Sequence, residues 1–266
     1  MNRMIIPIKT EKEIQMMQEG GKKLSWVFGQ LKPLIKSGSN LLKIEQQANQ
    51  LIKSIGAKPA FKQVANYHWA TCLNVNDEIV HGIPKDYQLK ANDVLNIDIG
   101  LYYRGFNTDM SSTFRVKTQP PKPNPQNNTV DEIDRFLATG KLALKEAQKQ
   151  AKVGNRVGHI SEKIQQIIEL AGYNCARNLT GHGVGRLLHE SPMIPCFLRG
   201  RIEETPLLQK GMTLAIEIIY TQGSPELITD NDGWTIRTKD GKISAVFEET
   251  IVISQKGYLV LTKVPF

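Results

Sequence analysis

Four acidic residues interrupt otherwise apolar, strand-like runs of this sequence. Asp98 and Asp109 lie in two successive runs, and Glu217 and Glu248 lie in two runs nearer the end of the chain. Acidic side chains are disfavoured in strands, and burying an ionised carboxylate costs several kcal/mol unless it is paired. Any one of them could face water at the edge of a sheet. Four separate cases instead favour a shared chemical role.

Asp98 and Asp109 are about equally far from a turn expected near residues 103–104. An antiparallel hairpin there would place the two side chains nearly opposite each other, with Cβ atoms ~5 Å apart, where like charges destabilise a sheet. A positive partner is therefore expected between them, either a shared proton or a divalent metal ion. The two glutamates favour the metal, because two divalent ions would balance four carboxylates.

A histidine between glycines completes the candidate set of ligands. His182 lies in the segment 180–185, interpreted as a loop, where glycines leave room for another group to approach. It could also belong to a surface turn. The glycines partly match a dinucleotide-binding motif, but no strand precedes them and no clear helix follows. Two aspartates, two glutamates and one histidine suit Mn, Fe(II), Co or Zn better than a structural thiolate zinc site.

The composition is that of an ordinary globular chain. Its 266 residues are 40% apolar and 23% charged, with a net charge of +8. No apolar run approaches the ~20 residues that span a bilayer, and the N-terminus lacks the pattern of a secretory signal. Cys72, Cys175 and Cys196 form neither a disulfide framework nor a zinc motif. We expect a cytoplasmic protein with reduced thiols, and neither a membrane nor DNA as a partner.

Helices followed by strands are expected twice along the chain. The expected helices lie between Thr10 and Pro33, and at 41–55, 129–151 and 157–171. Thr-x-x-Glu capping boxes at Thr10 and Thr129 open the first and third helices. The expected strands include 94–100, 106–114, 212–220, 235–239, 244–254 and 258–262.

A proline-rich connector at 118–128 separates the two halves of the chain, about 1–117 and 129–266. The halves have no residue-level repeat, but their similar order of elements suggests that they share one core. We therefore expect a single catalytic domain over residues 1–266. The separation of helices from antiparallel strands predicts an α+β fold.

The segments around the acidic residues resemble type I methionine aminopeptidases, and the similarity extends from Lys9 to the end of the chain. The matching segments are 56–61, 80–84, 96–98, 108–109, 181–185, 189–190, 210–212, 216–217, 232–235 and 248–251. Each match is weak alone, but their order and spacing are specific. The resemblance implies a metal-dependent peptidase with the pita-bread fold, in which two similar halves form an antiparallel sheet flanked by helices.

The resemblance also implies which side chains bind metal. Asp98 would hold one divalent ion, and His182 and Glu217 would hold a second, with Asp109 and Glu248 bridging both. The identity of the two ions (Co, Mn, Fe(II) or Zn) is left open. His81 and His189 would line the cleft without binding metal.

The implied reaction is hydrolysis of the first peptide bond of a nascent polypeptide, which removes the initiator methionine when the second residue is small. Metal coordination lowers the pKa of water from about 15.7 to about 7, and Glu217 is the expected proton acceptor. We expect His189 to contact the carbonyl oxygen and His81 the amide nitrogen. An apolar pocket should hold the methionine side chain. Its candidate residues, which could equally be plain core, are Phe61, Tyr67, Cys72, Leu188 and Trp234.

The sequence departs from the family pattern beside two of the glutamates. Ile218 follows Glu217 where the family usually has proline, and Glu249 follows Glu248 where it usually has histidine. The segment 66–72 also lacks the usual proline and serine. These changes are expected to lie near the substrate pocket, and to affect selectivity and turnover more than metal binding.

Four lysines form one stripe on the third predicted helix: Lys141, Lys145, Lys149 and Lys152. One interpretation is a solvated face whose charges complement the helix dipole. The other is electrostatic docking on ribosomal RNA near emerging chains, which should weaken steeply with salt. The protein is expected to be a monomer.

Other functions are weighed against this one. A related aminopeptidase of different specificity, such as an Xaa-Pro peptidase, usually has an additional N-terminal domain, for which this chain leaves no room. A catalytically inactive binding protein of the same fold tends to have lost metal ligands, and all five are present here. A nucleophilic hydrolase is poorly supported, because there is no Gly-x-Ser-x-Gly motif and Cys72 has no evident base partner.

Overall fold

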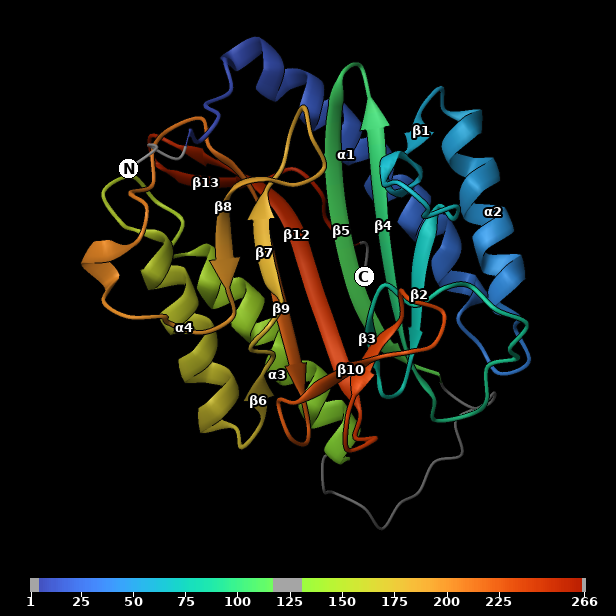
Figure 1. Ribbon diagram of the computed structural model, residues 1–266. Coiled ribbons are helices and arrows are strands. Elements are labelled where there is room, and N and C mark those ends of the chain that lie inside the picture. Colours follow the sequence, from blue (N-terminus) through green and yellow to red (C-terminus); the bar gives the residue numbers. More distant parts are fainter. Residues whose placement is uncertain (1–4, 117–130, 265–266) are drawn as a thin grey trace.

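Four helices lie on one face of a ten-stranded antiparallel sheet in the computed structural model, which describes residues 5–116 and 131–264 (Figure 1). The helices are α1 (Glu11–Leu31), α2 (Leu41–Ser54), α3 (Glu132–Gln148) and α4 (Val157–Leu170). The strands of the large sheet are β1 (Lys58–Pro59), β2 (Thr71–Val75), β4 (Val94–Tyr103), β5 (Phe106–Arg115), β6 (Asn174–Cys175), β7 (Thr180–Gly183), β8 (Glu190–Pro195), β9 (Thr213–Thr221), β12 (Ser244–Ser254) and β13 (Gly257–Val260). A separate three-stranded sheet consists of β3 (Glu78–Val80), β10 (Leu227–Thr229) and β11 (Ile236–Thr238).

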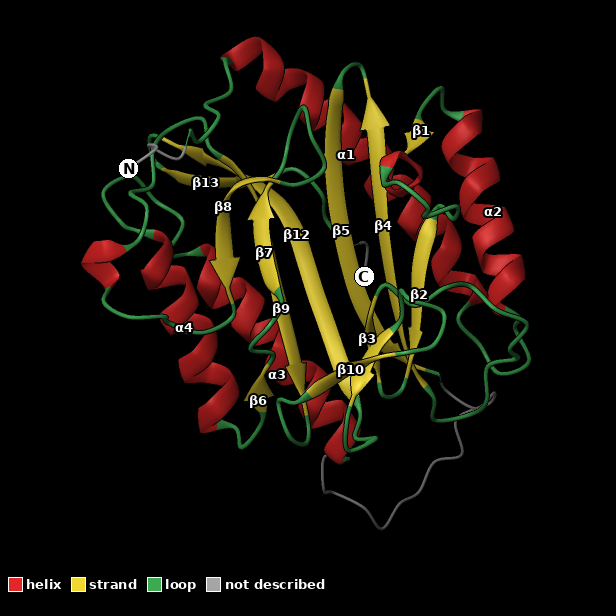
Figure 2. Ribbon diagram, viewed as in Figure 1, coloured by secondary structure: helices red, strands yellow, loops and turns green. Residues whose placement is uncertain are grey.

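The two halves of the chain contribute equivalent parts of the large sheet. The hairpin β4–β5 comes from the first half and the pair β9–β12 from the second, and β5 pairs with β12 where the halves meet. α1 packs on β4 and β5, and α3 packs on β9 and β12. Figure 2 shows the helices behind the strands in both halves. The predicted order of two helices followed by strands is therefore present twice, whereas the connector at 118–128 lies outside the described residues.

Local signals explain where two of the helices begin. At α1 the predicted capping box is present, because Thr10 Oγ1 accepts a hydrogen bond from Glu13 N (3.3 Å) and the Glu13 carboxylate accepts one from Thr10 N (2.7 Å). The predicted start of α3 is wrong. Its N-cap is Asp131, whose carboxylate accepts a hydrogen bond from Ile133 N (2.9 Å), while Thr129 lies outside the described residues. Aspartate is at least as good an N-cap as threonine, so the helix can begin at the later signal.

Each half has its own apolar core between helices and sheet. Phe28 of α1 clusters with Ile97 and Ile99 of β4, and Phe136 of α3 clusters with Ile218 of β9. All five side chains are fully buried. Since side chains alternate along a strand, the residues between these isoleucines must face the other, helix-free side of the sheet.

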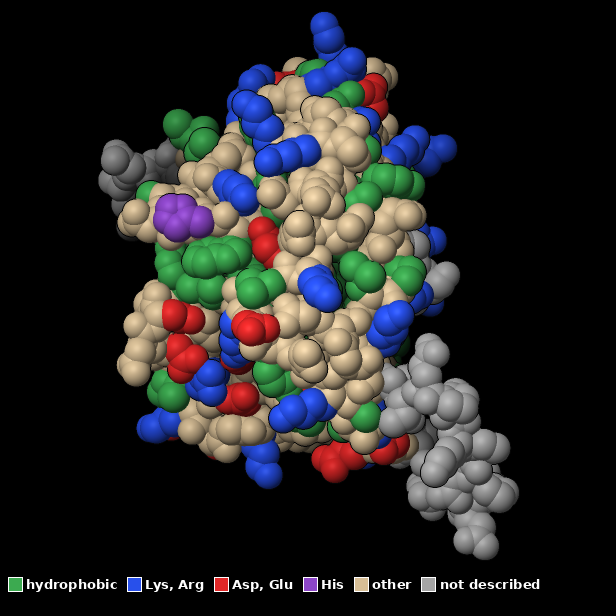
Figure 3. All heavy atoms as spheres, turned by 90° about the vertical axis from the view of Figure 1, so that its right-hand side faces the viewer, with side chains coloured by type: hydrophobic (Ala, Val, Ile, Leu, Met, Phe, Trp, Pro, Cys, Tyr) green, Lys and Arg blue, Asp and Glu red, His purple; other side chains and the backbone are tan. Residues whose placement is uncertain are grey.

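The face of the molecule that carries α2 is mixed in charge and also exposes some hydrophobic side chains (Figure 3). Figure 3 shows Lys and Arg side chains spread over the face beside α2, with Asp and Glu among them. Within residues 5–116 and 131–264, no helix is long and apolar enough to cross a membrane. The predicted lysine stripe is shorter than expected. α3 ends at Gln148, so that Lys149 is its C-cap and Lys152 lies beyond the helix.

Candidate active site

The side chains on the helix-free side of the sheet converge on one cavity of about 140 Å³. The residues that line it are Phe61, Val64, Tyr67, Cys72, Val80, His81, Asp98, Asp109, His182, Leu188, His189, Glu217, Trp234 and Glu248. All twelve residues predicted for the site are among them. Sequence reasoning missed Val64 and Val80. The position of Val80 directly before His81 could have indicated its place, whereas nothing in the sequence distinguishes Val64 from a core residue.

Strand register explains why the acidic side chains meet. Asp98 of β4 and Glu248 of β12 both lie opposite Ser111 of β5, one on each side, and Glu248 lies opposite Glu217 of β9. The three acidic residues therefore lie in one row across the sheet, on the same face. Asp109 lies on that face too, two residues before Ser111.

The predicted pairing of Asp98 with Asp109 is wrong by two residues. Asp98 lies opposite Ser111, and Asp109 lies opposite Gly100, so the two aspartates are diagonal neighbours on one face. The reason is the turn, which consists of Arg104 and Gly105 with φ values of +49° and +90°. Positive φ at both central residues is typical of the tight two-residue hairpin turn, and its position one residue later than expected sets the register.

His182 is also placed differently from the prediction, because it lies on β7 and not in a loop. Its neighbours are glycines because other backbone segments approach closely. A Cβ atom on Gly181 would lie 2.6 Å from Ala215 O, and one on Gly183 would lie 2.3 Å from Ser191 O. His182 Nδ1 is 2.8 Å from Gly183 O and must donate to it, since a carbonyl oxygen only accepts.

The hydrogen bond through Nδ1 leaves His182 Nε2 free to bind a metal, 3.4 Å from Glu217 Oε1. Burial, with a smaller contribution from His189, lowers the pKa of His182 to about 3, so the ring is neutral. Burial likewise lowers the pKa of His81 and of His189. Neutral imidazoles suit both metal binding and hydrogen bonding to a substrate.

The four carboxyl groups of the site are close together and only partly hydrogen-bonded. Burial raises the pKa of each, and the charge of Asp109 raises the pKa of Asp98, Glu217 and Glu248 further. Asp98 Oδ1 and Glu248 Oε1 are buried without a hydrogen-bond partner among the described residues. Ligand atoms of Asp109, His182 and Glu248 lie within 4.8 Å of one another. Orphaned oxygens and a neutral nitrogen this close together fit a divalent cation.

An aromatic wall borders the acidic cluster. The ring of Tyr67 packs edge-on against Trp234 at 5.1 Å and Phe61 at 6.4 Å, and its hydroxyl lies 3.2 Å from Cys72 Sγ. Leu188 closes this part of the cavity and is 8% exposed. An apolar side chain placed here would lie beside the carboxylates.

Two histidines complete the cavity without joining the acidic row. His189 packs against His182, with ring centroids 4.5 Å apart. His81 follows β3 with a φ of +58°, a conformation that few residues other than glycine adopt. The next amide, Gly82 N, donates to Asn74 Oδ1 (2.7 Å), which stabilises this local fold.

The predicted location of Ile218 and Glu249 beside the pocket is wrong. Both follow residues that face the cavity, so both face the helices. Ile218 is fully buried in the core under α3, and Glu249 accepts a hydrogen bond from Gln148 Nε2 of α3 (2.8 Å). Neither lines the cavity.

An antiparallel sheet that holds buried carboxylates and a neutral imidazole beside an apolar cavity fits a metal-dependent enzyme. The sequence matches the model of metallopeptidase family M24 over residues 15–255, so the chain belongs to this family. The predicted metal-dependent peptidase class is thereby confirmed, and a divalent metal requirement follows from it.

Individual relatives agree over nearly the whole chain. The sequence is 35% identical to "Methionine aminopeptidase" of Clostridium perfringens, covering 97% of this chain and 99% of that protein. It is 36% identical to "Methionine aminopeptidase 1" of Bacillus subtilis, covering 98% and 100%. The structure is similar to that of methionine aminopeptidase from Thermotoga maritima, with a TM-score of 0.89 at 36% identity over 97% of this chain and 100% of that one. The predicted family resemblance and pita-bread fold are confirmed.

Proposed function

We propose that this chain is a methionine aminopeptidase, which removes the N-terminal methionine from nascent polypeptides when the second residue is small. The observation that carries this proposal is that the carboxylate row and the aromatic wall line one and the same cavity. The full-length similarity to proteins named methionine aminopeptidase supports it, and favours neither an inactive binding protein nor a different specificity.

The metal site is proposed to hold two divalent ions. Asp98 would bind one and His182 and Glu217 the other, with Asp109 and Glu248 shared between them. Charge supports this number, because two divalent cations balance four carboxylates. When bound, such ions act as Lewis acids and lower the pKa of a coordinated water. The oxygen-rich ligand set suits Mn, Fe(II), Co or Zn.

The chain's own residues bind and orient the substrate. Glu217 is proposed to accept the proton of the attacking water and to pass it to the leaving amine, since its carboxylate lines the cavity beside His182. His189 would donate a hydrogen bond to the scissile carbonyl oxygen, and His81 to the amide group of the second residue. Both rings are neutral, so each presents one N–H and one acceptor nitrogen.

The methionine side chain is proposed to lie against the aromatic wall. A thioether is polarisable and packs well against ring edges, and Cys72 adds a second soft atom. The pocket residues are Phe61, Tyr67, Cys72, Leu188 and Trp234.

The test is hydrolysis of a Met-Ala-Ser peptide by chelated protein, with and without added Mn, Co, Fe(II) or Zn. We expect release of free methionine only with metal, slower release from Met-Leu-Ser, and a bound metal ratio near two per chain by elemental analysis. Asp109→Asn should lower both the metal content and the rate. An intact Met-Ala-Ser peptide after incubation with metal-loaded protein would refute the proposal.

A ribosome contact is a second, separate proposal. Lys141 and Lys145 are exposed on α3, and Lys149 pairs with Glu146 at 2.6 Å. Co-sedimentation of this chain, expected to be a cytoplasmic monomer, with ribosomes at low and high salt tests it. Binding that is absent, or that does not change with salt, contradicts the proposal.

A further inference from the structure

We propose that Asn107 and Gln63 are positioning residues that hold the segment 184–189, and with it His189, beside the metal-binding carboxylates. The inference rests on the proposed function and adds two residues outside the cavity to it. Neither residue touches the acidic row or lines the cavity.

Asn107 is fully buried on β5, and all its side-chain polar groups are occupied. Its Nδ2 donates to Gly185 O (3.1 Å) and to Arg186 O (3.2 Å), and its backbone N also donates to Gly185 O (2.6 Å). Its Oδ1 accepts a hydrogen bond from Gln63 Nε2 (2.9 Å). One amide therefore connects three parts of the chain that are far apart in sequence.

Each of these three parts leads directly into the cavity. Gln63 ends the short 3-10 helix Phe61–Gln63, whose first residue lines the aromatic wall. Asn107 lies two residues before Asp109, so both side chains are on the same face of β5. Gly185 is the second residue of the segment 184–189, which ends with His189. A change at Asn107 should therefore alter the position of residues 184–189, including His189, relative to the carboxylates.

The segment 184–189 needs hydrogen bonds such as those from Asn107 because it lies between two strands, β7 and β8. β7 ends at Gly183 and β8 begins at Glu190. Val184 still bonds to β9, because its N donates to Thr213 O (3.1 Å) and its O accepts from the Thr213 hydroxyl. The residues from Gly185 to His189 lie in neither strand. A second anchor holds the far end of the segment. Glu190 Oε1 accepts a hydrogen bond from Leu187 N (3.1 Å), and Glu190 Oε2 pairs with Lys9 Nζ.

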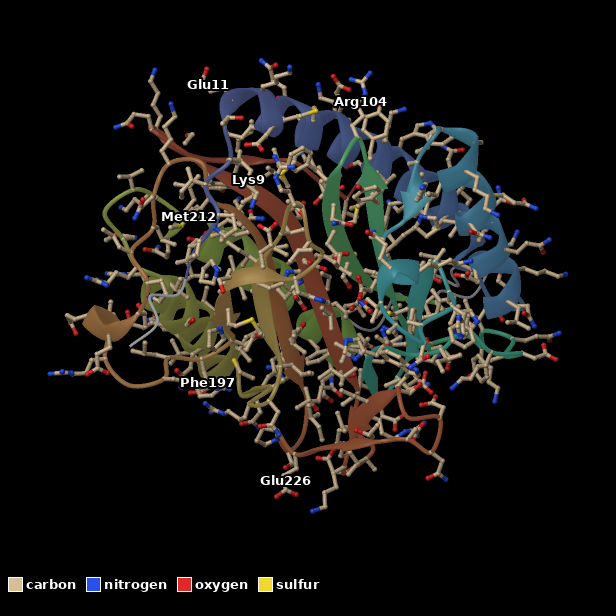
Figure 4. All side chains as sticks on the ribbon, turned by 45° about the horizontal axis from the view of Figure 1, so that its top comes forward. Lys9, Glu11, Arg104, Phe197, Met212 and Glu226 are labelled. Carbon is tan, nitrogen blue, oxygen red and sulfur yellow. The ribbon has the colours of Figure 1, made fainter. Side chains whose placement is uncertain are left out.

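This second anchor is buried as well. The side chains of Lys9 and Glu190 are 3% and 5% exposed. Figure 4 shows Lys9 within the outline of the molecule, whereas Glu11 projects from the surface. A Cβ atom on Gly185 would lie 2.3 Å from Lys9 Cε, so the two anchors meet at this glycine without spare room. Since the Lys9–Glu190 pair makes no hydrogen bond to Asn107, we expect a change at Asn107 to displace the segment and not to unfold it.

The test compares Asn107→Ala and Gln63→Ala with the parent, each alone and combined with His189→Ala. We expect kcat on Met-Ala-Ser to fall about 10- to 100-fold in Asn107→Ala, with a smaller fall in Gln63→Ala and little change in KM, because small displacements of a catalytic group are costly. In the His189→Ala background, Asn107→Ala should change kcat by no more than about twofold, since both changes remove the same contribution.

Hydrogen–deuterium exchange gives a readout that needs no activity. Amides of 184–189 should exchange faster in Asn107→Ala, while those of β9 and β12 stay protected. Asn155→Ala is the matched control. Its amide donates to Gln150 O (2.9 Å) between α3 and α4, so it should alter neither kcat nor exchange at 184–189. If Asn107→Ala does not fold, Gln63→Glu retains the size of the side chain and replaces the donor with a charged acceptor beside Asn107 Oδ1.

The two proposals fail in different ways. If metal-loaded parent protein releases no methionine, the proposed function fails, and the exchange data alone decide the positioning role. Unchanged exchange at 184–189, or an undiminished loss of kcat from Asn107→Ala in the His189→Ala background, overturns the positioning role while leaving the proposed function intact.

Discussion

Glu248 lies directly opposite Glu217 in the pairing of β12 with β9. Directly opposed like charges destabilise a sheet, and these two are buried together with the carboxyl groups of Asp98 and Asp109. Without a cation, protonation relieves the repulsion. Burial and the charge of Asp109 raise the pKa of both glutamates, and the charge of Glu217 raises the pKa of Glu248 further. The described residues of this cavity therefore need a bound cation, or retained protons, to balance the negative charge of the four carboxylates.

Neutralising one of these glutamates should stabilise the metal-free protein and weaken metal binding. In chelated protein we expect Glu248→Gln to raise the free energy of unfolding at pH 8 by about 1 kcal/mol, because one repulsive pair is lost. With Mn present, the same variant should bind less metal and be less stable than the parent. Thermal unfolding with and without chelator, together with elemental analysis, measures both. Glu226→Gln, an exposed residue paired with Lys239, is the control and should change neither.

The stability of chelated protein should fall as pH rises from about 6.5 to 7.5, around the value of about 7 to which burial raises the pKa of Asp109. A carboxyl group whose pKa is raised on folding retains a proton that the unfolded chain has already lost, so deprotonation favours unfolding, by about 1.4 kcal/mol per pH unit for each retained proton. The raised pKa values of Asp98, Glu217 and Glu248 give this sign. Buried histidines act oppositely, but only below their usual pKa near 6.5.

Added metal should remove this pH dependence, because it binds the deprotonated carboxylates. Denaturant unfolding at several pH values, with chelator or with Mn, makes the comparison. A chelated protein that is equally stable at both ends of this range would contradict the expectation.

The two cavity histidines that are not proposed as ligands should differ from the ligand His182. We expect His189→Ala to lower kcat about 10²- to 10³-fold with little change in KM and an unchanged metal content, as for loss of one oxyanion donor. His182→Ala should lose metal as well. Steady-state kinetics and elemental analysis distinguish the two variants. His68→Ala, which alters an exposed histidine, is the control, and a loss of metal in His189→Ala would show that this residue is a ligand.

Ile218 and Glu249 should affect stability and not selectivity, because both face the helices. Ile218→Val is expected to cost about 0.5–1.5 kcal/mol of unfolding free energy through loss of one buried methyl group. Glu249→Gln retains the size of the side chain beside Gln148. KM and kcat on Met-Ala-Ser and Met-Leu-Ser should stay within about twofold of the parent. A change in the preference between these peptides would place one of the two residues in contact with substrate.

Much of the site was visible in the sequence because its signals are local. A carboxylate inside an apolar strand is anomalous wherever the strand pairs, so Asp98, Asp109, Glu217 and Glu248 could be selected without knowing the fold. The capping box at Thr10 is likewise complete within four residues. These features depend on short spacing along the chain, and the structure has them where the sequence predicts them.

Tertiary structure decided what no local pattern contains. A two-residue turn at Arg104 and Gly105 set the register that makes Asp98 and Asp109 diagonal neighbours. Close backbone packing explains the glycines on both sides of His182. The sequence alone suggests that this segment is a loop. The side-chain hydrogen bonds of Asn107 could not be predicted from any local sequence pattern, since they join it to residues 44 and 78 positions away. Such contacts depend on which strand faces are buried and on where each turn closes, and only the folded chain determines both.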